Sequence, residues 1–563
     1  MISKTVTETI LDVIAAAGVR HVFGIVGDAI NPLVDAIRRD DRIDWIHMRH
    51  EEAGAFAASA QAKLTGRLAV CAGTVGPGAI HLLNGLYDAK KDHAPVLALT
   101  GQVPRAEIGS DYHQEVDLDA LFADVCLFNE TIHVPEQMPR LAVEAVQAAL
   151  AGGGVAHLSI PSDIGPQPVT NAAEPNMIFQ LSGDICPAAA DLQKAAELLN
   201  NADKVGILCG IGCRDAAAEL LEVAELLAAP VAYSLRGKAI VDHDHPYWVG
   251  ATGLIGSPAG MHAVEDADVL LMVGTNFPYR NWLPHGKPVI QIDIRAEHLG
   301  KRVPLAIGLV GHARATLAAL KPLLRTKRDR SFLKSIQERK KQFDCQKDRE
   351  ADLSRDADLI HPQAIAAVIS EVASKDAVFC VDTGEVTVWA AHHLRLKHTQ
   401  EMLASFNLAS MAFAMPGAIG AQLVDRRRQV VALCGDGGFS MLMGDLITAV
   451  NYDLPITMVI FNNGKLGLVK MEMEVAGYPE YGTTLKNPNF ADIARVCGAG
   501  GIRVESPKAL RPAIEEAINT PRPFVVDVVC SGDELTIPPR IEFKQAWGYS
   551  LAKIREFLVP SDE

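Results

Sequence analysis

The 563-residue chain has no excess of basic residues, because 53 Lys and Arg stand against 68 Asp and Glu, a formal net charge of -15. Sequence-independent binding to DNA or RNA needs clustered basic side chains, so the composition argues against a nucleic-acid partner and favours a small molecule. The chain also lacks any uncharged apolar run of about 18 residues, so no transmembrane helix is predicted. Its start, MISKTVTETILDVIAAAG, has neither the basic beginning nor the apolar centre of a signal peptide, and we expect a cytoplasmic protein.

Cysteine pairing with metal-site spacing is also lacking. The ten cysteines are scattered, and the closest two, Cys209 and Cys213 in CGIGC, have no second pair or histidine cluster beside them that would complete a zinc site. We interpret CGIGC as a glycine turn between two buried thiols, with a metal or redox role as the less favoured alternative.

Short apolar runs alternate with helical patterns along the whole chain. With 49% hydrophobic and 21% charged residues the composition is that of an ordinary globular protein, and roughly 150 residues per domain predicts about three domains. The runs are nearly continuous in apolar residues, which indicates parallel strands buried on both faces. We therefore predict an α/β protein with three doubly wound parallel-sheet domains, from the runs RLAVCAGT, PVLALTG, VAHLSIP, VGILCG, DVLLMVGTN, PVIQIDI, AVFCVDTG, QVVALCGDG, ITMVIFNN and FVVDVV.

Proline-rich and charge-dense segments divide this pattern. The stretch PSDIGPQPVTNAAEPN closes a first domain, residues 1–182. A charged segment, residues 329–355, is interpreted as a solvated helix and linker between a central domain, 186–328, and a third domain, 356–531. The tail, 532–563, predicts one short amphipathic helix that docks onto its own protein rather than onto a membrane surface. This helix would carry Trp547, Leu551, Ile554, Phe557 and Leu558.

The segment CGDGGFSMLMGD, Cys434 to Asp445, puts an aspartate among glycines where a strand meets a helix. Ligands of an open parallel sheet collect beyond the carboxyl ends of strands. The glycines permit close backbone approach, and the helix start aims free N–H groups at an anion such as a phosphate. Because Asp436 would repel a phosphate unless a cation lay between them, we predict Mg²⁺ at this position.

The next strand, ITMVIFNNG, ends in Asn462 and Asn463. Asn463 lies 27 positions after Asp436 (463 minus 436), enough for one helix and a return strand, so we expect the two side chains to meet at adjacent strand ends. Mg²⁺ takes about six oxygens, commonly one or two protein side chains with phosphate oxygens. Each motif alone is also typical of a plain turn, but the two at this spacing are far more specific.

GDGG followed by NN at this distance is similar to the thiamine diphosphate and Mg²⁺ signature. The chain resembles the thiamine diphosphate-dependent family that includes the ubiquinone-linked pyruvate oxidases and the acetolactate synthases, through RHEEAGAFAASAQAKLTG, LRGK, TGLIG, GTNFPYR, SFNLASMAFAMP and CGDGGFSMLMGD. The resemblance implies a pyrimidine-binding first domain, an FAD-binding central domain and a diphosphate-binding third domain.

The resemblance gives roles around the thiamine diphosphate. Glu51 matches the acid that hydrogen-bonds the aminopyrimidine across a subunit interface and promotes proton removal from the thiazolium ring; by sequence alone Glu51 and Glu52 are equally typical of first-turn helix acids. Met411 matches the bulky residue that supports the bent cofactor, although a core methionine is equally expected. The other implied contacts are Ala409, Ser410, Asp436, Gly437, Gly438, Asn463, Gly464, Lys465, Leu466, Gly467, Leu468 and Val469, with Asp436, Asn463 and the Lys465 carbonyl as metal ligands.

Substrate-side residues follow from the same resemblance. Gln114 matches a glutamine that faces the substrate, and the glycine loop Gly73 to Gly78 is placed near the pyrimidine. His113 and Leu468 each stand where pyruvate oxidases carry phenylalanine, and His113 adds a group that titrates near neutrality. Glu472 is implied at the substrate site and is equally typical of a solvated helix acid.

The central domain resembles the flavin domain of the pyruvate oxidases. Its strand and loop ends are rich in glycine, and Asp293 closes a strand where an acid can bind a ribose hydroxyl. His312 replaces the aspartate of the family. The implied FAD contacts are Arg236, Thr252, Gly253, Leu254, Ile255, Thr275, Asn276, Phe277, Pro278, Tyr279 and Asp293.

The resemblance therefore implies oxidative decarboxylation of pyruvate to acetate and CO₂, with electrons passing through FAD to a quinone or another acceptor. It also implies a cytoplasmic homotetramer with at most peripheral contact at the inner face of the cell membrane. Two alternatives stay open. One is acetolactate synthase-type joining of 2-oxo acids with an FAD that is not reduced, and the other is a nucleotide-binding regulatory protein without turnover.

Overall fold

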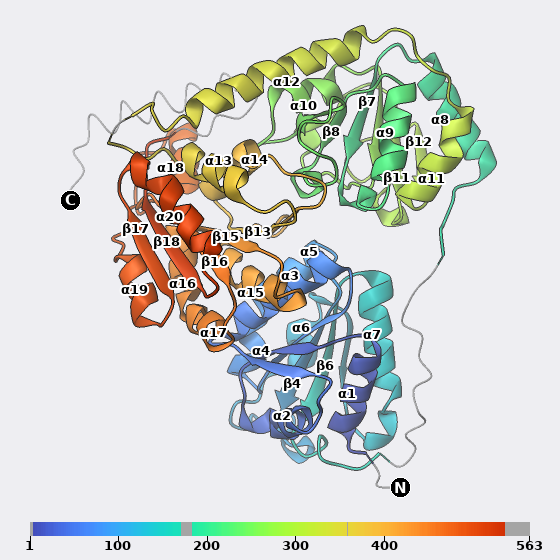
Figure 1. Cartoon of the computed structure of the whole chain (residues 1–563). Helices are drawn as coiled ribbons and strands as arrows, with labels where there is room; N and C mark the ends of the chain where they lie inside the picture. Colours follow the sequence, from blue (N-terminus) through green and yellow to red (C-terminus); the bar gives the residue numbers. More distant parts are fainter. Residues whose placement is uncertain (1–3, 170–182, 357, 535–563) are drawn as a thin grey trace.

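A computed structural model describes residues 4–169, 183–356 and 358–534 of the chain. It contains three six-stranded parallel sheets flanked by helices, one in each third of the sequence (Figure 1). This confirms the predicted fold class of three doubly wound α/β domains. The helix predicted within 532–563 falls mostly on residues 535–563, which lie outside the described residues. Part of the proline-rich stretch predicted to close the first domain, from residue 170 on, also lies outside them.

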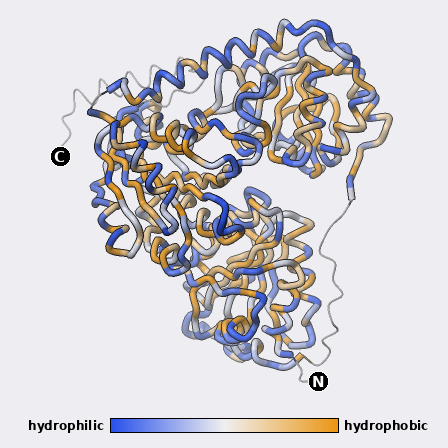
Figure 2. The backbone as a smooth tube through the Cα atoms, viewed as in Figure 1, coloured by the Kyte–Doolittle hydropathy of each residue, from blue (hydrophilic) through white to orange (hydrophobic). Residues whose placement is uncertain are grey.

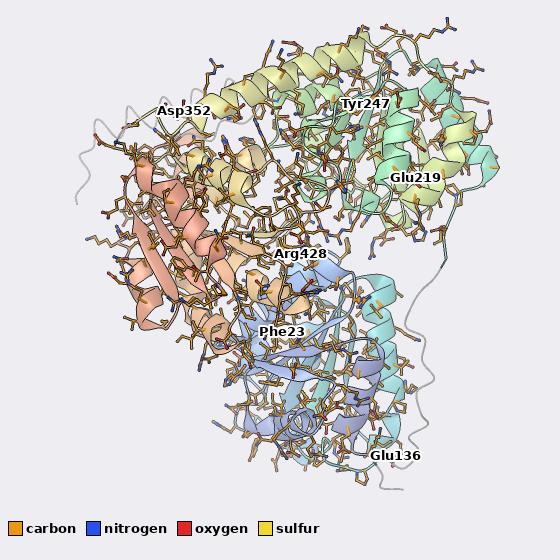
Figure 3. The ribbon with its side chains drawn as sticks, in the orientation of Figure 1. Phe23, Glu136, Glu219, Tyr247, Asp352 and Arg428 are labelled. Atoms are coloured by element: carbon orange, nitrogen blue, oxygen red, sulfur yellow. The ribbon has the colours of Figure 1, made fainter. Side chains whose placement is uncertain are left out.

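The N-terminal sheet has the strand order β2-β1-β3-β4-β6-β5. Its strands are β1 (His21–Gly24), β2 (Asp44–His47), β3 (Ala69–Gly73), β4 (Val96–Gln102), β5 (Cys126–Thr131) and β6 (Val155–Pro161). Its helices are α1 (Val6–Ala16), α2 (Asn31–Arg38), α3 (Glu51–Thr65), α4 (Pro77–His81), α5 (Leu83–Lys91), α6 (Leu118–Phe122) and α7 (Arg140–Gly152). Phe23, on β1, is fully buried inside this domain (Figure 3).

The central sheet has the order β12-β11-β10-β7-β8-β9. Its strands are β7 (Val205–Cys209), β8 (Val231–Tyr233), β9 (Trp248–Ala251), β10 (Val269–Val273), β11 (Val289–Asp293) and β12 (Ile307–Val310). Its helices are α8 (Ala189–Asn201), α9 (Ala217–Leu226), α10 (Pro258–Glu265) and α11 (Ala313–Leu320). Counted within the domain this is the order 3-2-1-4-5-6 read backwards, which is the order of dinucleotide-binding sheets.

The C-terminal sheet has the order β14-β13-β15-β16-β18-β17, with strands β13 (Val378–Val381), β14 (Glu401–Ala404), β15 (Val430–Gly435), β16 (Ile456–Asn462), β17 (Gly500–Val504) and β18 (Phe524–Val529). Its helices are α13 (Pro362–Val372), α14 (Glu385–His393), α15 (Ala414–Val424), α16 (Asp436–Leu442), α17 (Leu446–Asn451), α18 (Gly467–Val475), α19 (Phe490–Val496) and α20 (Pro507–Asn519). The first and third sheets thus share one order, 2-1-3-4-6-5, and one switch point, between the first and third strands of each, where ligands of such sheets bind.

Helices α3 and α15 join the N-terminal and C-terminal domains through small residues. Gly420 on α15 lies so close to α3 that a Cβ there would be 2.1 Å from the Ala57 carbonyl oxygen. Phe56 and Phe413 meet edge to face next to this crossing, with ring centroids 5.8 Å apart. One hydrophobic core therefore runs from the first domain into the third.

A long helix, α12 (Ser331–Glu350), crosses from the central domain to the C-terminal domain along one side of the molecule (Figure 1). It is mostly hydrophilic, whereas the central domain beside it contains many hydrophobic segments (Figure 2). Among the described helices none is both long and apolar enough to cross a bilayer.

Candidate functional site

Asp436 lies where β15 ends and α16 begins, at the switch point of the C-terminal sheet. Its side chain is held by three donors: Oδ1 accepts from the Gly437 N–H at 2.8 Å, and Oδ2 accepts from the Gly464 N–H and the Asn487 side-chain amide, both at 2.7 Å. The residue is 2% exposed, and this burial raises the pKa of the carboxyl against the opposing effect of the N–H groups. A buried carboxylate with a fixed orientation is a suitable ligand for a hard cation.

Asn463 follows β16, the strand beside β15, and brings a second oxygen to the same edge of the sheet. Its Oδ1 accepts from the Lys465 N–H at 3.0 Å, and its Nδ2 donates to Glu385 Oε2 at 3.0 Å. The prediction that Asp436 and Asn463 follow adjacent strand ends is confirmed, since β15 and β16 pair directly. Asp436 also accepts from Gly464, the residue after Asn463, so carboxylate and amide oxygens, ligand types that Mg²⁺ takes, come from neighbouring strand ends.

Two further residues belong to this cluster although no sequence motif singled them out. Glu385 begins α14, and burial is the largest cause that raises its pKa to about 7. Asn487 bridges Asp436 and Asn462 through its side-chain amide, at 2.7 and 2.9 Å. Glu385 follows a strand-end aspartate in VDTGE, a signal of the same kind as GDG, whereas Asn487 lies in a loop that carries no such signal.

Glycines let neighbouring protein segments pack closely around this cluster. A Cβ on Gly438 would lie 2.2 Å from Asp382 Oδ2, and a Cβ on Gly467 would lie 2.1 Å from Glu385 Oε2. A Cβ on Gly437 would meet Met411 at 3.2 Å, together with Leu466 and Leu485. The structure thus brings Met411, Gly437 and Leu466 together, as expected for residues that surround one cofactor.

The backbone around Met411 is strained. Ala409 and Ala412 have φ values of 58° and 67°, in the left-handed region that L-residues rarely adopt, and they flank Ser410 and Met411. Such strain persists only where the surroundings impose it, and it gathers at binding sites. The Ser410 hydroxyl accepts from the Asn84 side chain at 3.0 Å, which ties this segment to the N-terminal domain.

A second cluster forms at the carboxyl edge of the N-terminal sheet around Glu51, the first residue of α3. Glu51 is 6% exposed, its Oε2 lies 3.0 Å from His81 Nδ1, and its Oε1 would lie 3.2 Å from a Cβ on Gly78. Gln114 has φ 65° and packs on the same loop, because a Cβ on Gly76 would lie 2.7 Å from its carbonyl oxygen. The predicted Glu51, glycine loop and Gln114 are therefore neighbours, and His113 is exposed beside them.

His81 was not anticipated from the sequence. Its ring stacks on His50, with centroids 4.5 Å apart, and His50 caps α3 by accepting from the Glu52 N–H. In the described part of the chain, ligand atoms of His50, Glu51 and His81 lie within 4.8 Å of one another, so these three side chains could also hold a metal ion.

The two clusters share no direct hydrogen bond within one described chain, although Asn84 donates to both Glu52 and Ser410. Among the described residues no hydrogen bond joins Glu51 to Asp436, Asn463 or Met411. Glu472 and Val469 are exposed on α18, and Leu468 is half-buried there. These three predicted residues line an open helix face rather than an enclosed substrate pocket in the single chain.

The central sheet presents its own candidate site at the switch point between β7 and β10. Gly210 and Gly274 follow these strands, and a Cβ on Gly210 would lie 2.5 Å from the Gly274 carbonyl oxygen. Thr252 Oγ1 and Asn276 Oδ1 are buried, and no hydrogen-bond partner for either is found among the described residues. Leu254 and Tyr279 are 40% and 46% exposed beside them. Unpaired buried polar atoms next to exposed apolar side chains fit a dinucleotide such as FAD.

The other predicted FAD contacts have internal partners. Asp293 accepts from the Arg295 N–H at 2.9 Å and lies 3.3 Å from His298 Nδ1. The Arg236 guanidinium donates to the Asp92 carbonyl oxygen at 2.7 Å and points toward the N-terminal domain. Thr275 and Phe277 are buried, and Phe277 meets Tyr279 at 5.7 Å.

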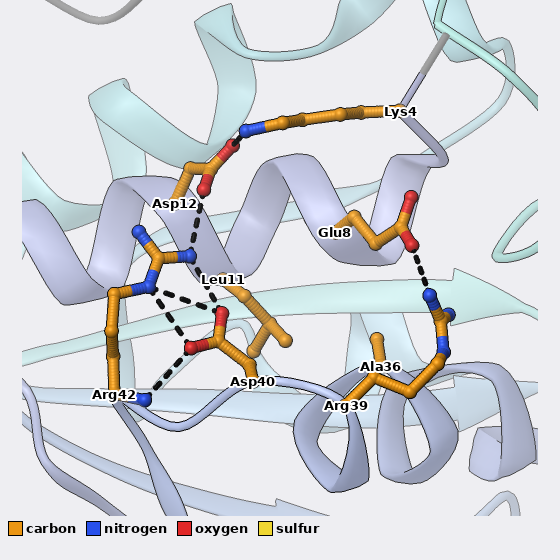
Figure 4. A pocket seen from close by; sticks show the side chains of 8 residues that line it. All are labelled: Lys4, Glu8, Leu11, Asp12, Ala36, Arg39, Asp40 and Arg42. Atoms are coloured by element: carbon orange, nitrogen blue, oxygen red, sulfur yellow. Dashed lines mark hydrogen bonds and ion pairs between the residues drawn. The ribbon is translucent and has the colours of Figure 1, made fainter. Parts of the chain in front are cut away.

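A surface pocket between α1 and α2 lies apart from all of these residues (Figure 4). Its charged side chains pair with one another: Lys4 and Arg42 with Asp12, Arg42 with Asp40, and Arg39 with Glu8. Because each charge has a partner, the pocket offers no unmatched group to a charged ligand.

Comparison with known families matches three parts of the chain to one group of domains. Residues 4–121 match the thiamine pyrophosphate enzyme N-terminal TPP binding domain, residues 192–320 the central domain, and residues 382–528 the C-terminal TPP binding domain. These segments contain the Glu51 cluster, the central-sheet site and the Asp436 cluster, respectively.

Curated relatives cover nearly the whole chain. A protein named putative thiamine pyrophosphate-containing protein YdaP, from Bacillus subtilis, is 41% identical over 558 residues, 99% of this chain and 97% of the relative. A pyruvate oxidase from Lactiplantibacillus plantarum is 33% identical over 93% of this chain and 88% of its own length. An acetolactate synthase isozyme 2 large subunit from Escherichia coli is 31% identical over 94% of this chain and 95% of its own length.

Proposed function

The chain belongs to the thiamine pyrophosphate enzyme family, and from that premise we propose that it oxidatively decarboxylates pyruvate. In the balanced reaction, pyruvate, water and an oxidised acceptor give acetate, CO₂ and an acceptor that has gained two electrons and two protons. The relative named pyruvate oxidase supports pyruvate as the substrate. The observation that carries the proposal is the buried Asp436 carboxylate, held by three donors at the switch point of the C-terminal sheet.

We propose that Asp436, Asn463 and the Lys465 carbonyl hold Mg²⁺ and through it the diphosphate. Thiamine diphosphate, when bound, supplies the electron sink that loss of CO₂ requires. Met411, which the strained backbone on either side holds in place, would support the cofactor, and Gly437, Gly438 and Gly467 let the surrounding protein segments pack closely at this site.

In this proposal Glu51 holds a proton for the pyrimidine. Its burial and its contact with His81 fix the carboxyl orientation, and a positioned carboxyl group near a reacting nitrogen is a general acid or base. We propose that Gln114, whose backbone lies beside Gly76, orients the carboxylate of the 2-oxo acid.

We propose that two copies of the chain complete the site. Glu51 and Asp436 share no hydrogen bond in one described chain, and apolar side chains beside the Glu51 cluster are exposed, with Val26 at 45% and Ile80 at 44%. We propose that the Glu51 cluster of one copy faces the Asp436 cluster of another, in a dimer or, as inferred from the family, a tetramer.

The central domain is proposed to bind FAD, which supplies two-electron redox chemistry between substrate and acceptor. Thr252 and Asn276 would take polar groups of FAD, and Leu254 and Tyr279 would cover apolar ones. A quinone is the proposed acceptor, with at most peripheral membrane contact.

The test uses purified full-length protein with thiamine diphosphate, Mg²⁺, FAD, pyruvate and an artificial two-electron acceptor. Acetate, CO₂ and reduced acceptor in equal amounts are expected. Acetolactate formed without acceptor reduction would favour the carbon–carbon bond-forming reaction named for the E. coli relative. Absence of any pyruvate decarboxylation would contradict both reactions.

A further inference from the structure

Helix α14 contacts the candidate thiamine site with one end and the candidate flavin site with the other. Its first residue, Glu385, accepts from the Asn463 side chain at 3.0 Å. Near its last turn, His392 Nε2 lies 3.1 Å from the Ile255 carbonyl oxygen and 3.2 Å from that of Gly256. A single helix of the C-terminal domain therefore reaches the central-domain loop that is proposed to contact FAD.

His392 is a hydrogen-bond donor in this contact. Both partners are carbonyl oxygens, which only accept, so the proton must reside on Nε2. Burial is the largest cause that lowers the pKa of His392, to about 3, and the ring is therefore neutral near pH 7. The Phe343 ring of α12 meets the imidazole edge to face at 5.5 Å and closes its other side.

The same helix end is held from the central domain. Lys238 is buried, and its Nζ donates to the Ala391 carbonyl oxygen at 2.8 Å. Contacts thus run in both directions between neighbouring residues, from Lys238 to α14 and from His392 to the loop. Paired contacts of this kind fix the position of the central domain relative to the C-terminal domain at this point.

The contacted loop, residues 252–256, contains two glycines, of which Gly253 adopts a conformation that only glycine takes readily. Gly253 has φ 105°, and a Cβ on Gly256 would lie 2.6 Å from the Ala251 carbonyl oxygen. Thr252 Oγ1 is buried without a partner among the described residues, while Leu254 is exposed. His392 therefore binds the carbonyl oxygens at the end of a loop whose preceding residues face the proposed nucleotide.

We propose that His392 is a positioning residue that holds loop 252–256 in the conformation that binds FAD, through its Nε2–H donated to Ile255 and Gly256. This inference rests on the FAD site of the proposed function. Because α14 also begins at Glu385, beside the proposed diphosphate site, this contact fixes the position of the flavin-binding loop relative to the C-terminal domain.

Three variants of the full-length protein test this role. His392→Met removes the donor and leaves the part-buried carbonyl oxygens of Ile255 and Gly256 without it, whereas His392→Gln keeps an N–H donor at a similar reach. His393→Met is the matched control, because His393 is also buried on α14 and its Nε2 has no hydrogen-bond partner in the described chain.

Two measurements are made on each variant. FAD affinity is measured by quenching of flavin fluorescence, and hydrogen exchange of the Thr252, Gly256 and Ser257 amides is measured in flavin-free protein. For H392M we expect about tenfold weaker FAD binding and about tenfold faster exchange, because the loop loses the donor that satisfies two part-buried carbonyl oxygens. H392Q and H393M are expected to stay close to wild type in both, and all variants are expected to bind thiamine diphosphate with Mg²⁺ as wild type does.

If the wild-type protein binds FAD but H392M and H393M have the same FAD affinity and exchange rates, the positioning role of His392 is wrong, while the FAD part of the proposed function stands. Equal FAD loss in H392M and H392Q would also overturn it, because the donor would then be irrelevant. Wild-type protein that binds no FAD would overturn the flavin part of the proposed function and this role with it.

Discussion

Replacing Gly438 with alanine tests the geometry of the Asp436 turn. The added Cβ would lie 2.2 Å from Asp382 Oδ2, 2.9 Å from its Cγ and 3.2 Å from the Ala412 nitrogen. Asp382 cannot swing away freely, since it is buried and its Oδ1 accepts from the Ala414 N–H at 2.9 Å. Either α16 or the segment that carries Met411 must therefore move, by about 1 Å if the contact is to reach an ordinary van der Waals distance.

Overpacking of this kind lowers the free energy of unfolding by about 1 to 3 kcal/mol. For a domain of this size each kcal/mol lowers the melting temperature by about 2 to 4 °C. Because α16 starts at Asp436, the shift also moves the metal ligand, and a misplacement of about 1 Å at a functional site can cost about a hundredfold. We expect Gly438→Ala to melt at a lower temperature and to bind thiamine diphosphate with Mg²⁺ far more weakly, as followed by calorimetric titration.

Gly435→Ala is the matched control. Gly435 adjoins Asp436 on the other side, has an ordinary extended backbone with φ -71°, and has nothing within 4 Å of an added Cβ. It is expected to bind the cofactor as wild type does. If Gly438→Ala behaved like Gly435→Ala in both measurements, the close packing described for this turn would be wrong.

Three further predictions concern charged groups. Lys63→Met removes the cation paired with the fully buried Asp88 and Asp92 at 2.7 and 2.6 Å, leaving Asp92 with Arg236 at 3.9 Å as its cation; chemical denaturation should show a loss of about 3 to 5 kcal/mol, and a loss below about 1 kcal/mol would contradict a buried network. Since burial raises the pKa of Glu385 from 4.5 to about 7, the folded state prefers the protonated acid, and its contribution to stability is lost as pH rises through that interval. In cofactor-free protein the melting temperature of Glu385→Gln relative to wild type should therefore rise between these pH values; a constant difference would show that Glu385 does not titrate there. Glu51→Gln should lower pyruvate turnover about a hundredfold or more while the cofactor is retained, and turnover within threefold of wild type would remove Glu51 from the chemistry.

Most interior strands could be predicted from the sequence because both of their faces are buried, but the short interior strands β1 (HVFG) and β8 (VAY) were missed. Runs such as VVALCG and ITMVIFN are almost wholly apolar and correspond to β15 and β16, in the middle of the C-terminal sheet. The edge strands were not predicted: β2, β5, β9, β12, β14 and β17 each pair on one side and carry mixed sequences such as CLFNET or GGIRV. A strand at the edge of a sheet has more of its side chains exposed, so its sequence does not have to be continuously apolar.

The site divides in the same way. Asp436 and Asn463 could be predicted because each directly follows a strong strand signal, and parallel strands bring their carboxyl ends to one edge. Asn487 and His81 could not, since each reaches its partner from a loop or short helix whose position depends on tertiary packing. The contact of His392 with Ile255 joins residues 137 positions apart in different domains, which no local pattern records.

The claim on which the proposed function depends is that Asp436 binds the metal that holds the diphosphate. Titration calorimetry of wild type and Asp436→Ala with thiamine diphosphate, in Mg²⁺ and again in EDTA, measures this directly. The account predicts Mg²⁺-dependent binding by wild type and binding weakened about a hundredfold or more by Asp436→Ala, because loss of a supporting residue alone costs about 10- to 100-fold at such sites. Equal affinities of the two proteins, or wild-type binding that is unchanged in EDTA, would contradict it.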